Sequence, residues 1–370
     1  MHVLLTTDSV GGVWTYTEEL STGLVRNGHQ VTLVSFGYAL DEGQRAWLRG
    51  MRSPRFQCME TEYRLEWMDN AAEDLARSSE LLRGLAERLQ PDLLHSNQFA
   101  YGDLSDTLPV LVTGHSDVLS WWQAVHGEGV PDTGRMRAYA ALVRSGLRMA
   151  TRLAAPTAWM ARELREQYGI DRPIEVIPNG RSPELFLPDR PKSLQAITVG
   201  RAWDPGKHVA LLEEIDVPMP LLIAGEPVSP VSAAHVPGAP AVSTARGVTY
   251  LGKQDAAQLQ ELYSRTAIYI ATSRYEPFGL APLEGALSGC ALVLSDLPTL
   301  REIWSDAAIF YPAGDARSLE RILRRLAVAP QEVDDLAARA LARARTRYSA
   351  SAMVTQHEAL YGSLVRVTAV

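Results

Sequence analysis

The sequence has little cysteine and no long apolar run, and both absences narrow what the protein is. Among 370 residues there are two cysteines, Cys58 and Cys290, which lie far apart without metal-ligand spacing. This excludes a disulfide scaffold and suits a reducing compartment. No apolar stretch approaches the roughly 18 residues of a membrane-spanning helix. The N-terminal residues MHVLLTTDSVGG carry no cationic leader and predict a buried strand, so we expect a cytoplasmic protein.

The sequence also lacks an excess of positive charge. Its net charge is −7, which gives no overall attraction to nucleic acid, and we expect no nucleic-acid partner. Neither G-x-x-x-x-G-K-[ST] nor G-x-G-x-x-G occurs, so a P-loop and a dinucleotide-binding turn have no support. The 46% hydrophobic and 21% charged residues are typical of a globular protein.

Short apolar runs alternate with amphipathic stretches along the whole chain. This alternation indicates an α/β protein with parallel sheets. Helices are predicted over 13–27 and 69–89 and through the C-terminal tail. Strands are predicted over 2–7, 30–36, 92–97, 109–114, 152–157, 174–178, 194–200, 220–226, 248–252, 267–273, 291–296 and 308–311.

The chain is long enough for two domains. A proline-containing polar segment without periodicity, residues 181–193, predicts a linker after an N-terminal domain at 1–180. The alternation then restarts, which predicts a second domain over 194–346. We expect the last segment, 347–370, to form a helix that packs back on the first domain. Residues 227–247 are rich in Pro, Ala, Ser and Val and predict a surface loop.

Candidate site residues follow the strands, because open parallel sheets bind ligands beyond the carboxyl ends of their strands. Gly11 and Gly12 follow the first strand, where glycines let the backbone approach a ligand or simply form a turn. His115 and Ser116 follow another strand. Gly-His-Ser resembles the start of the nucleophile elbow of ester hydrolases, but Val118 stands where that turn needs glycine. We favour His115 as a ligand-facing residue over a structural histidine.

Two cations follow the first strand of the second half, in GRAWDPGK at 200–207. Arg201 and Lys207 at a strand end suit a phosphate or diphosphate. The alternative is an ordinary surface pair.

The stretch SRYEPFGLAPLEGALSGC, residues 273–290, joins a predicted strand to a helix that starts near Leu280. The amides of Phe278, Gly279 and Leu280 at the helix start would form an anion site. Glu276 and Glu284 flank this site eight positions apart. Carboxylates accept hydrogen bonds from hydroxyl pairs, so phosphate between sugar hydroxyls fits this stretch. The alternative is a capping acid followed by a solvated one.

The segment EPFGLAPLE resembles the E-x7-E motif of the family 4 retaining glycosyltransferases. Other segments resemble that family's motifs in the same order: GGVW (11–14), GHSD (114–117), VIPNG (176–180) and GRAWDPGK (200–207). The resemblance implies the GT-B fold, two Rossmann-like parallel-sheet domains that face each other across a cleft. It also implies retaining transfer of a sugar from a nucleoside diphosphate sugar to a hydroxyl acceptor, without a metal or another cofactor.

The resemblance also implies roles for individual residues. Arg201 and Lys207 would hold the diphosphate and stabilise the charge that develops as it leaves, and the amides of residues 278–280 would bind the same phosphates or the adjacent sugar. Glu276 would face the transferred sugar and Glu284 the ribose hydroxyls.

In the N-terminal domain, His115 would lie near the donor sugar and the acceptor. Gly11 and Gly12 would line the diphosphate. The resemblance therefore implies a catalytic set of His115, Glu276, Arg201 and Lys207.

The acceptor side has weaker candidates. Trp14, Trp121 and Trp122 are candidates to stack on an acceptor sugar, or they belong to the core. Residues 135–152 hold five arginines and no acid, with Arg144, Arg148 and Arg152 expected on one helical face. Such a face suits weak contact with an anionic membrane, or is simply solvated.

Three other functions stay open at this point: another GT-B enzyme acting on sugar nucleotides (an epimerase or a hydrolase), an esterase that uses Ser116, and a sugar-nucleotide binding protein without catalysis. The sequence does not identify the base, the donor sugar or the acceptor.

Overall fold

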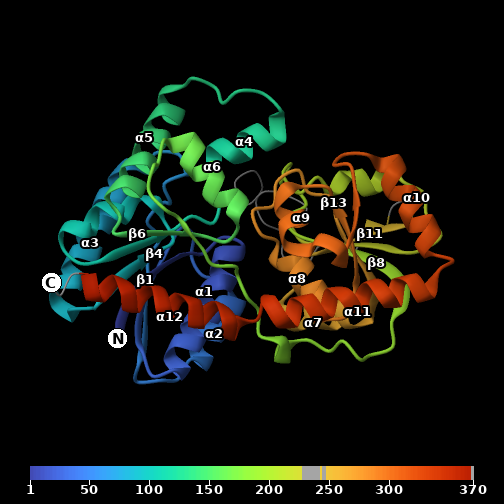
Figure 1. Cartoon of the computed structure of the whole chain (residues 1–370), viewed down its shortest axis with the longest axis horizontal. Coiled ribbons are helices and arrows are strands. Elements are labelled where there is room, and N and C mark those ends of the chain that lie inside the picture. Colours follow the sequence, from blue (N-terminus) through green and yellow to red (C-terminus); the bar gives the residue numbers. More distant parts are fainter. Residues whose placement is uncertain (227–241, 244–246, 368–370) are drawn as a thin grey trace. The chain divides into compact units, whose positions relative to one another are not determined.

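The computed structural model describes residues 1–226, 242–243 and 247–367 (Figure 1). The surface loop predicted over 227–247 therefore lies outside the described residues, except for 242–243 and Gly247. None of the described helices combines the length and the apolar composition needed to cross a bilayer.

The chain forms two compact units, and each is described by itself. Unit 1 comprises Met1–Gln123, Gly127–Gly180 and the C-terminal segment from Ala350. Unit 2 comprises Arg181–Ser349 together with Ala124–His126.

Apart from the short segment Ala124–His126, the chain passes between the units after Gly180 and after Ser349. Residues 181–193, predicted as a linker, are part of unit 2 and include the 3-10 turn η2 at Pro183–Leu185. The predicted C-terminal segment divides at Ser349 into the end of unit 2 and the last helix of unit 1.

Unit 1 is built on a seven-stranded parallel sheet in the order β3-β2-β1-β4-β5-β6-β7. Its strands are β1 (His2–Asp8), β2 (Gln30–Phe36), β3 (Phe56–Glu60), β4 (Leu93–Ser96), β5 (Val110–Thr113), β6 (Arg152–Ala155) and β7 (Glu175–Val176). The central strands are buried on both faces, which is why they read as continuous apolar runs.

Two hydrophobic cores cover the two faces of this sheet, since successive side chains of a strand point to opposite faces. On β1, Leu4 belongs to one core, whereas Val3 and Leu5 belong to the other. The helices around the sheet are α1 (Gly12–Arg26), α2 (Glu42–Gly50), α3 (Ala72–Leu89), η1 (Phe99–Asp106), α4 (Val118–His126), α5 (Gly134–Met149), α6 (Ala158–Tyr168) and α12 (Ala350–Val367).

Helix α12 lies beside α1 although the two are at opposite ends of the chain (Figure 1). Gly23 of α1 makes this close packing possible, because a Cβ atom there would lie 2.3 Å from Cγ2 of Val354. Met353, Val354, Tyr361 and Leu364 of α12 complete the same core as Val3 and Leu5.

Unit 2 is built on a second seven-stranded sheet, in the order β10-β11-β9-β8-β12-β13-β14. All pairs are parallel except β10 with β11. Its strands are β8 (Ser193–Val199), β9 (Leu221–Ala224), β10 (Val242–Ser243), β11 (Val248–Gly252), β12 (Thr266–Ala271), β13 (Ala291–Ser295) and β14 (Ile309–Tyr311).

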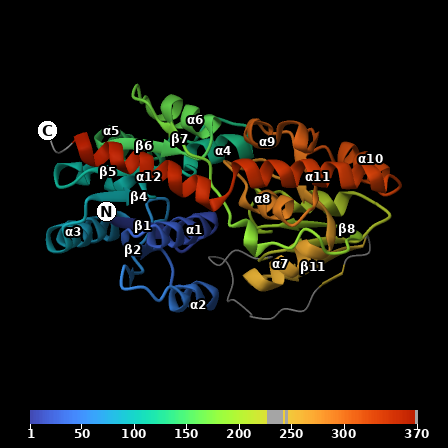
Figure 2. The same ribbon diagram turned by 60° about the horizontal axis from the view of Figure 1, so that its bottom comes forward.

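The helices of unit 2 cover both faces of its sheet. They are η3 (Val209–Glu214), α7 (Ala256–Arg265), α8 (Leu280–Leu287), α9 (Pro298–Trp304), η4 (Ser305–Ala307), α10 (Ala316–Leu326) and α11 (Pro330–Arg347). Helix α11 runs along α8 (Figure 2). On β12, Ile268 and Ile270 enter one core, and Tyr269 and Ala271 enter the other.

The predicted fold class is confirmed, and every predicted strand is present. Strands β3 and β10 were not predicted. β3 is an edge strand with half-exposed side chains, so it lacks the apolar run that marks a central strand.

Candidate active site

Each sheet has a switch point, where the strand order reverses around its first strand. In unit 2 this point lies between β8 and β12, and in unit 1 between β1 and β4. Loops that follow such strands form the ligand crevice of open α/β sheets. The predicted site residues of unit 2 lie in the loops after β8 and β12, or at the start of α8.

The loop after β8 is organised by Asp204, which is buried. Its carboxylate accepts hydrogen bonds from Nη2 of Arg201 at 2.7 Å and from the amide of Gly206 at 2.8 Å. The guanidinium of Arg201 lies over the ring of Trp203, with 5.4 Å between the guanidinium carbon and the ring centroid. Asp204 therefore holds Arg201 in place while leaving 40% of the arginine side chain exposed.

Lys207 and Glu276 meet between the loops after β8 and β12. Nζ of Lys207 lies 2.5 Å from Oε2 of Glu276, and the two side chains are 22% and 11% exposed. The main chains are tied as well: the amide of Arg274 donates to the carbonyl of Gly206 at 2.8 Å, and Oγ1 of Thr272 donates to the carbonyl of Lys207 at 2.7 Å. A cation and a carboxylate from two neighbouring loops thus contact each other.

Helix α8 begins at Leu280, four residues after Glu276. Its N-cap is Gly279 at φ 94°, in the left-handed region that favours glycine, and within the described chain no side chain caps this helix end. The first amides of a helix lack intrahelical partners and carry positive partial charge. The side chain of Phe278 is buried against Tyr348, with 5.7 Å between the ring centroids, so only its backbone faces the turn.

Glu284, one turn into α8, lies against Arg181. Nε of Arg181 is 3.0 Å from Oε1 of Glu284, and the side chains are 10% and 13% exposed. Arg181 was not predicted as a site residue, because it was assigned to the linker. In the sequence, Arg181 stands among apolar and proline residues, and this setting indicates burial. A buried arginine requires an acidic partner, which could have pointed to the pair.

In unit 1, Gly11 directly precedes α1 and Gly12 is its first residue, and both are exposed. Gly11 is the N-cap of α1 at φ 73°. The turn is held by Asp8, whose Oδ1 accepts from the amide of Val10 at 3.2 Å. The start of α1 therefore carries an exposed glycine pair, and its role in binding a ligand stays a prediction.

His115 follows β5 and is oriented by Asn97, which follows β4. Nε2 of His115 lies 2.9 Å from Oδ1 of Asn97, whose Nδ2 donates to the carbonyl of Thr6 at 2.7 Å. Burial, followed by the nearby His357, lowers the pKa of His115 to about 3, so the ring is neutral at pH 7. Since Oδ1 accepts, Nε2 carries the proton and Nδ1 is the acceptor nitrogen. Asn97 was not predicted, although a polar residue after a central strand is the signal for it.

A buried polar network lies behind His115. The His115 ring contacts Tyr16, with 4.4 Å between the centroids, and the hydroxyl of Tyr16 hydrogen-bonds to Nε2 of His357 at 2.8 Å. His357 stacks on His95, whose Nδ1 lies 2.6 Å from the hydroxyl of Tyr361. Burial also lowers the pKa of His357, to about 4, and that of His95. The network joins α12 to α1 and to the strands that carry the site loops.

The comparisons with known proteins identify the family of this chain. The family model of Glycosyltransferase Family 4 matches residues 10–185, and that of Glycosyl transferases group 1 matches residues 209–343. The chain belongs to the family 4-type GT-B glycosyltransferases. It is a glycosyltransferase, since the two models together match most of the chain.

Solved structures match this glycosyltransferase along almost its whole length. Sucrose-phosphate synthase from Thermosynechococcus elongatus is 18% identical, with a TM-score of 0.78 over 99% of this chain and 100% of that one. HepE from Anabaena, solved with UDP-glucose, is 16% identical, with a TM-score of 0.73 over 98% and 100%. These likenesses show the GT-B fold.

A curated relative shares only part of the sequence. O-antigen chain mannosyltransferase RfbU from Salmonella typhimurium is 26% identical over 86 residues, which is 23% of this chain and 24% of that protein. The match thus spans about a quarter of the relative's length.

Two predicted features of unit 1 of the glycosyltransferase are corrected. Trp14 is 4% exposed and its Nε1 donates to Glu18 at 2.6 Å, so it is a core residue and not part of an acceptor surface. Ser116 is exposed, and among the described residues no histidine hydrogen-bonds to it, which removes the support for an esterase. Trp121 and Trp122 are half-buried on α4, with their ring centroids 6.5 Å apart.

The predicted arginine face is also corrected. Helix α5 ends at Met149, so Arg152 belongs to β6 and does not extend the helical face of Arg144 and Arg148. Arg144 and Arg148 donate to the carbonyls of Tyr168 and Gly169, at the end of α6. These two arginines satisfy helix-terminal carbonyls and are themselves exposed, so both still present positive charge at the surface.

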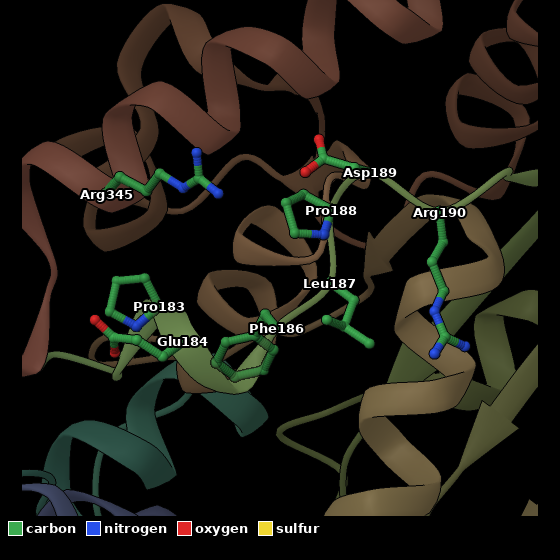
Figure 3. A pocket seen from close by; sticks show the side chains of 8 residues that line it. All are labelled: Pro183, Glu184, Phe186, Leu187, Pro188, Asp189, Arg190 and Arg345. Atoms are coloured by element: carbon green, nitrogen blue, oxygen red, sulfur yellow. The ribbon is translucent and has the colours of Figure 1, made fainter.

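The glycosyltransferase has a surface cavity of about 470 Å³ in unit 2 (Figure 3). Residues of the segment 183–190 and Arg345 line it, and none of the predicted site residues does. Among the described residues, no three His, Cys, Asp or Glu side chains are placed to share a metal ion.

Proposed function

We propose that this glycosyltransferase transfers a sugar from a nucleoside diphosphate sugar to a hydroxyl acceptor. Unit 2 binds the donor, and unit 1 supplies the acceptor side. The observation that carries this assignment is the contact between Lys207 and Glu276 beside the start of α8. A cation, a carboxylate and open helix amides are the groups that a diphosphate joined to a sugar requires. HepE, one structural relative, is described in complex with UDP and with UDP-glucose, which supports this donor class.

Lys207, Arg201 and the amides at the start of α8 bind the diphosphate in this proposal. When the bond between the anomeric carbon and the diphosphate oxygen breaks, the diphosphate gains negative charge. Fixed cations stabilise that charge without reorganising. Lys207 then exchanges its contact with Glu276 for phosphate. Because protein cations perform this task, we propose a metal-independent reaction.

The two glutamates bind hydroxyl groups on either side of the diphosphate. Glu276 faces the transferred sugar and Glu284 the ribose, because carboxylates accept hydrogen bonds from hydroxyl pairs. The hydrogen bond from Ser273 Oγ to Glu276 Oε2, at 3.3 Å, orients the first carboxylate.

His115 acts near the transferred sugar as a neutral hydrogen-bonding group. Asn97 fixes its ring, and the lowered pKa keeps positive charge away from the oxocarbenium character that develops on the sugar. The backbone at Gly11 and Gly12 lines the diphosphate. Trp121 and Trp122 are the remaining candidates for acceptor contact.

We extend the proposal to retention of the anomeric configuration, which rests on the E-x7-E arrangement of the family. We also propose a cytoplasmic location. Cys58 and Cys290 are both free thiols, which suits a reducing compartment. Burial raises the pKa of Cys58 to about 12 and that of Cys290 to about 11, so neither thiol is activated as a nucleophile.

A thermal-shift panel tests the donor assignment. UDP, GDP, ADP and TDP sugars are each added with EDTA and, separately, with Mg²⁺. We expect at least one to raise the melting temperature equally under both conditions, because a ligand of the folded state stabilises it. Nuclear magnetic resonance of the product then reports the anomer, and incubation without acceptor separates transfer from epimerisation or hydrolysis. A panel without any stabilising sugar nucleotide would remove the proposed donor class.

A further inference from the structure

Arg181 is a buried cation whose position is fixed at several points. Its Nε lies 3.0 Å from Oε1 of Glu284, and its guanidinium carbon lies 5.6 Å from the ring centroid of Phe186. Its backbone amide donates to the carbonyl of Tyr348 at 3.0 Å. Both the main chain and the side chain of Arg181 are therefore held within unit 2.

This arrangement restricts Glu284 more than a solvated pair would. A glutamate side chain on a helix has several rotatable bonds, and a lone carboxylate samples several orientations. The guanidinium is a rigid planar donor, and with its carbon over the ring of Phe186 it presents its N–H groups in one direction. An arginine rather than a lysine at this position defines the orientation of the carboxylate as well as its distance.

The pair also faces a low-dielectric environment. Tyr263 and Tyr269 are fully buried, and burial, with the charge of Glu284 as a further cause, raises the pKa of both phenols. In such surroundings a carboxylate requires an opposite charge, which Arg181 supplies.

We propose that Arg181 is a positioning residue that orients Glu284 toward the ribose of the donor, and that this pair sets the discrimination between ribose and deoxyribose nucleotides. This role rests on the proposed function. A carboxylate has two oxygens and about four acceptor sites, so an ion pair with Arg181 through Oε1 is compatible with hydrogen bonds from ribose hydroxyls. If the hydroxyl is missing, an oriented, buried carboxylate loses a partner that solvent does not readily replace, and affinity falls.

Calorimetric titration with ribonucleotides and their deoxy counterparts tests this role. UDP, GDP and ADP are each compared with the 2′-deoxy and 3′-deoxy forms, on the wild type and on Arg181→Met, Arg181→Lys, Glu284→Gln and the double variant Arg181→Met/Glu284→Gln. In the wild type we expect at least one deoxy form to bind about tenfold more weakly, the loss expected for one hydrogen bond to a charged group. In Arg181→Met this ratio falls to about twofold or less. Arg181→Lys keeps the charge but not the fork and gives an intermediate ratio.

A matched control is Arg190→Met. Arg190 forms an exposed ion pair with Glu261 at 2.8 Å in the same unit. We expect the Arg190→Met variant to keep the wild-type ratio of ribonucleotide to deoxynucleotide affinity.

Since Arg181 acts through Glu284, the double variant loses no more discrimination than Glu284→Gln alone. Thermal unfolding identifies variants that fail to fold. Should Arg181→Met unfold, the double variant, which buries no unpaired carboxylate, and Arg181→Lys carry the comparison.

The outcomes separate this role from the proposed function. Wild-type discrimination in Arg181→Met or in the folded Arg181→Lys, together with lost discrimination in Glu284→Gln, overturns the role of Arg181 alone. Unchanged discrimination in Glu284→Gln, or equal binding of all forms by the wild type, overturns ribose recognition by Glu284 and the role of Arg181 with it. A wild type that binds none of the nucleotides overturns the proposed function.

Discussion

The two units support their site residues in different ways. Around His115 in unit 1, the polar groups are neutral: three imidazoles including His115 itself, tyrosine hydroxyls and the Asn97 amide, linked by hydrogen bonds and ring contacts. In unit 2, the site residues form ion pairs, Lys207 with Glu276, Arg201 with Asp204 and Arg181 with Glu284.

This difference follows from what each unit is proposed to bind. A neutral network avoids burying charge, and it orients a histidine without placing a cation beside the sugar. Ion pairs cost desolvation, but they keep cations in position for an anionic diphosphate. The arrangement of the site residues therefore depends on neutral histidines in unit 1 and on ion pairs in unit 2. Both dependences can be tested by experiment.

The largest expected effect comes from removing the cation of unit 2. Lys207→Ala should lower the transfer rate about 100-fold or more, because it deletes a charge that stabilises the leaving diphosphate. Initial rates with a saturating donor measure this loss, and circular dichroism checks the fold. Lys253→Ala is the matched control, since Lys253 is an exposed lysine of the same unit, paired with Glu226 at 3.4 Å. Equal rates in both variants would remove Lys207 from the reaction.

Acid should destabilise unit 1 through its histidines. The folded-state pKa of His115 is lowered to about 3 and that of His357 to about 4, from 6.5. Between pH 6.5 and about 4 the unfolded chain binds protons that the folded chain does not. The contribution of these histidines to the free energy of unfolding is therefore completely present above pH 6.5. On acidification below pH 6.5 it falls by roughly 1 kcal/mol per pH unit for each histidine.

Urea unfolding at pH 7 and pH 5 measures this acid effect, and hydrogen exchange of β1 and α12 assigns it to unit 1. His357→Gln retains a hydrogen-bonding group near Tyr16 but does not titrate, so its pH slope should be smaller by one proton. A wild-type slope of zero would contradict the neutral network.

A smaller effect is expected from the organiser of the β8 loop. Asp204→Ala leaves the amide of Gly206 and the guanidinium of Arg201 without their carboxylate, which should cost about 1–3 kcal/mol of stability. The Michaelis constant for the donor should rise because Arg201 is no longer held. Chemical unfolding and donor titration measure the two effects. Wild-type values for both would mean that Asp204 does not organise this loop.

The smallest effect concerns the arginines of unit 1. Arg144→Ala should lower stability by about 1 kcal/mol or less, through loss of its hydrogen bond to the carbonyl of Tyr168. We expect this hydrogen bond to be the main role of Arg144, so binding to anionic vesicles at low salt should not change. Weaker flotation of the variant would instead support the membrane contact that the sequence predicted.

Much of the fold was predictable from the sequence because the signals are local. The central strands are apolar runs of the right length, and the site loops follow them directly. Lys207 and Glu276 lie 69 positions apart, yet both follow strands of one sheet, and β8 and β12 proved to be neighbours. Strand ends and their loops were therefore readable, whereas the half-exposed edge strand β3 was not.

The remaining site features depend on contacts between distant segments, which no local pattern encodes. The local sequence around Trp14 does not distinguish a core residue from a surface residue, and only the packing of α1 shows that Trp14 is buried. Tyr16 and His357 meet across 341 positions, and Arg181 reaches Glu284 because α8 and the segment after Gly180 converge in unit 2. Hydrophobic periodicity and turn residues determined the alternating strands and helices and the types of side chain at the strand ends. The pairing of those side chains was decided by tertiary packing, because burial leaves each charge or hydrogen-bonding group only the partners that the folded chain brings to it.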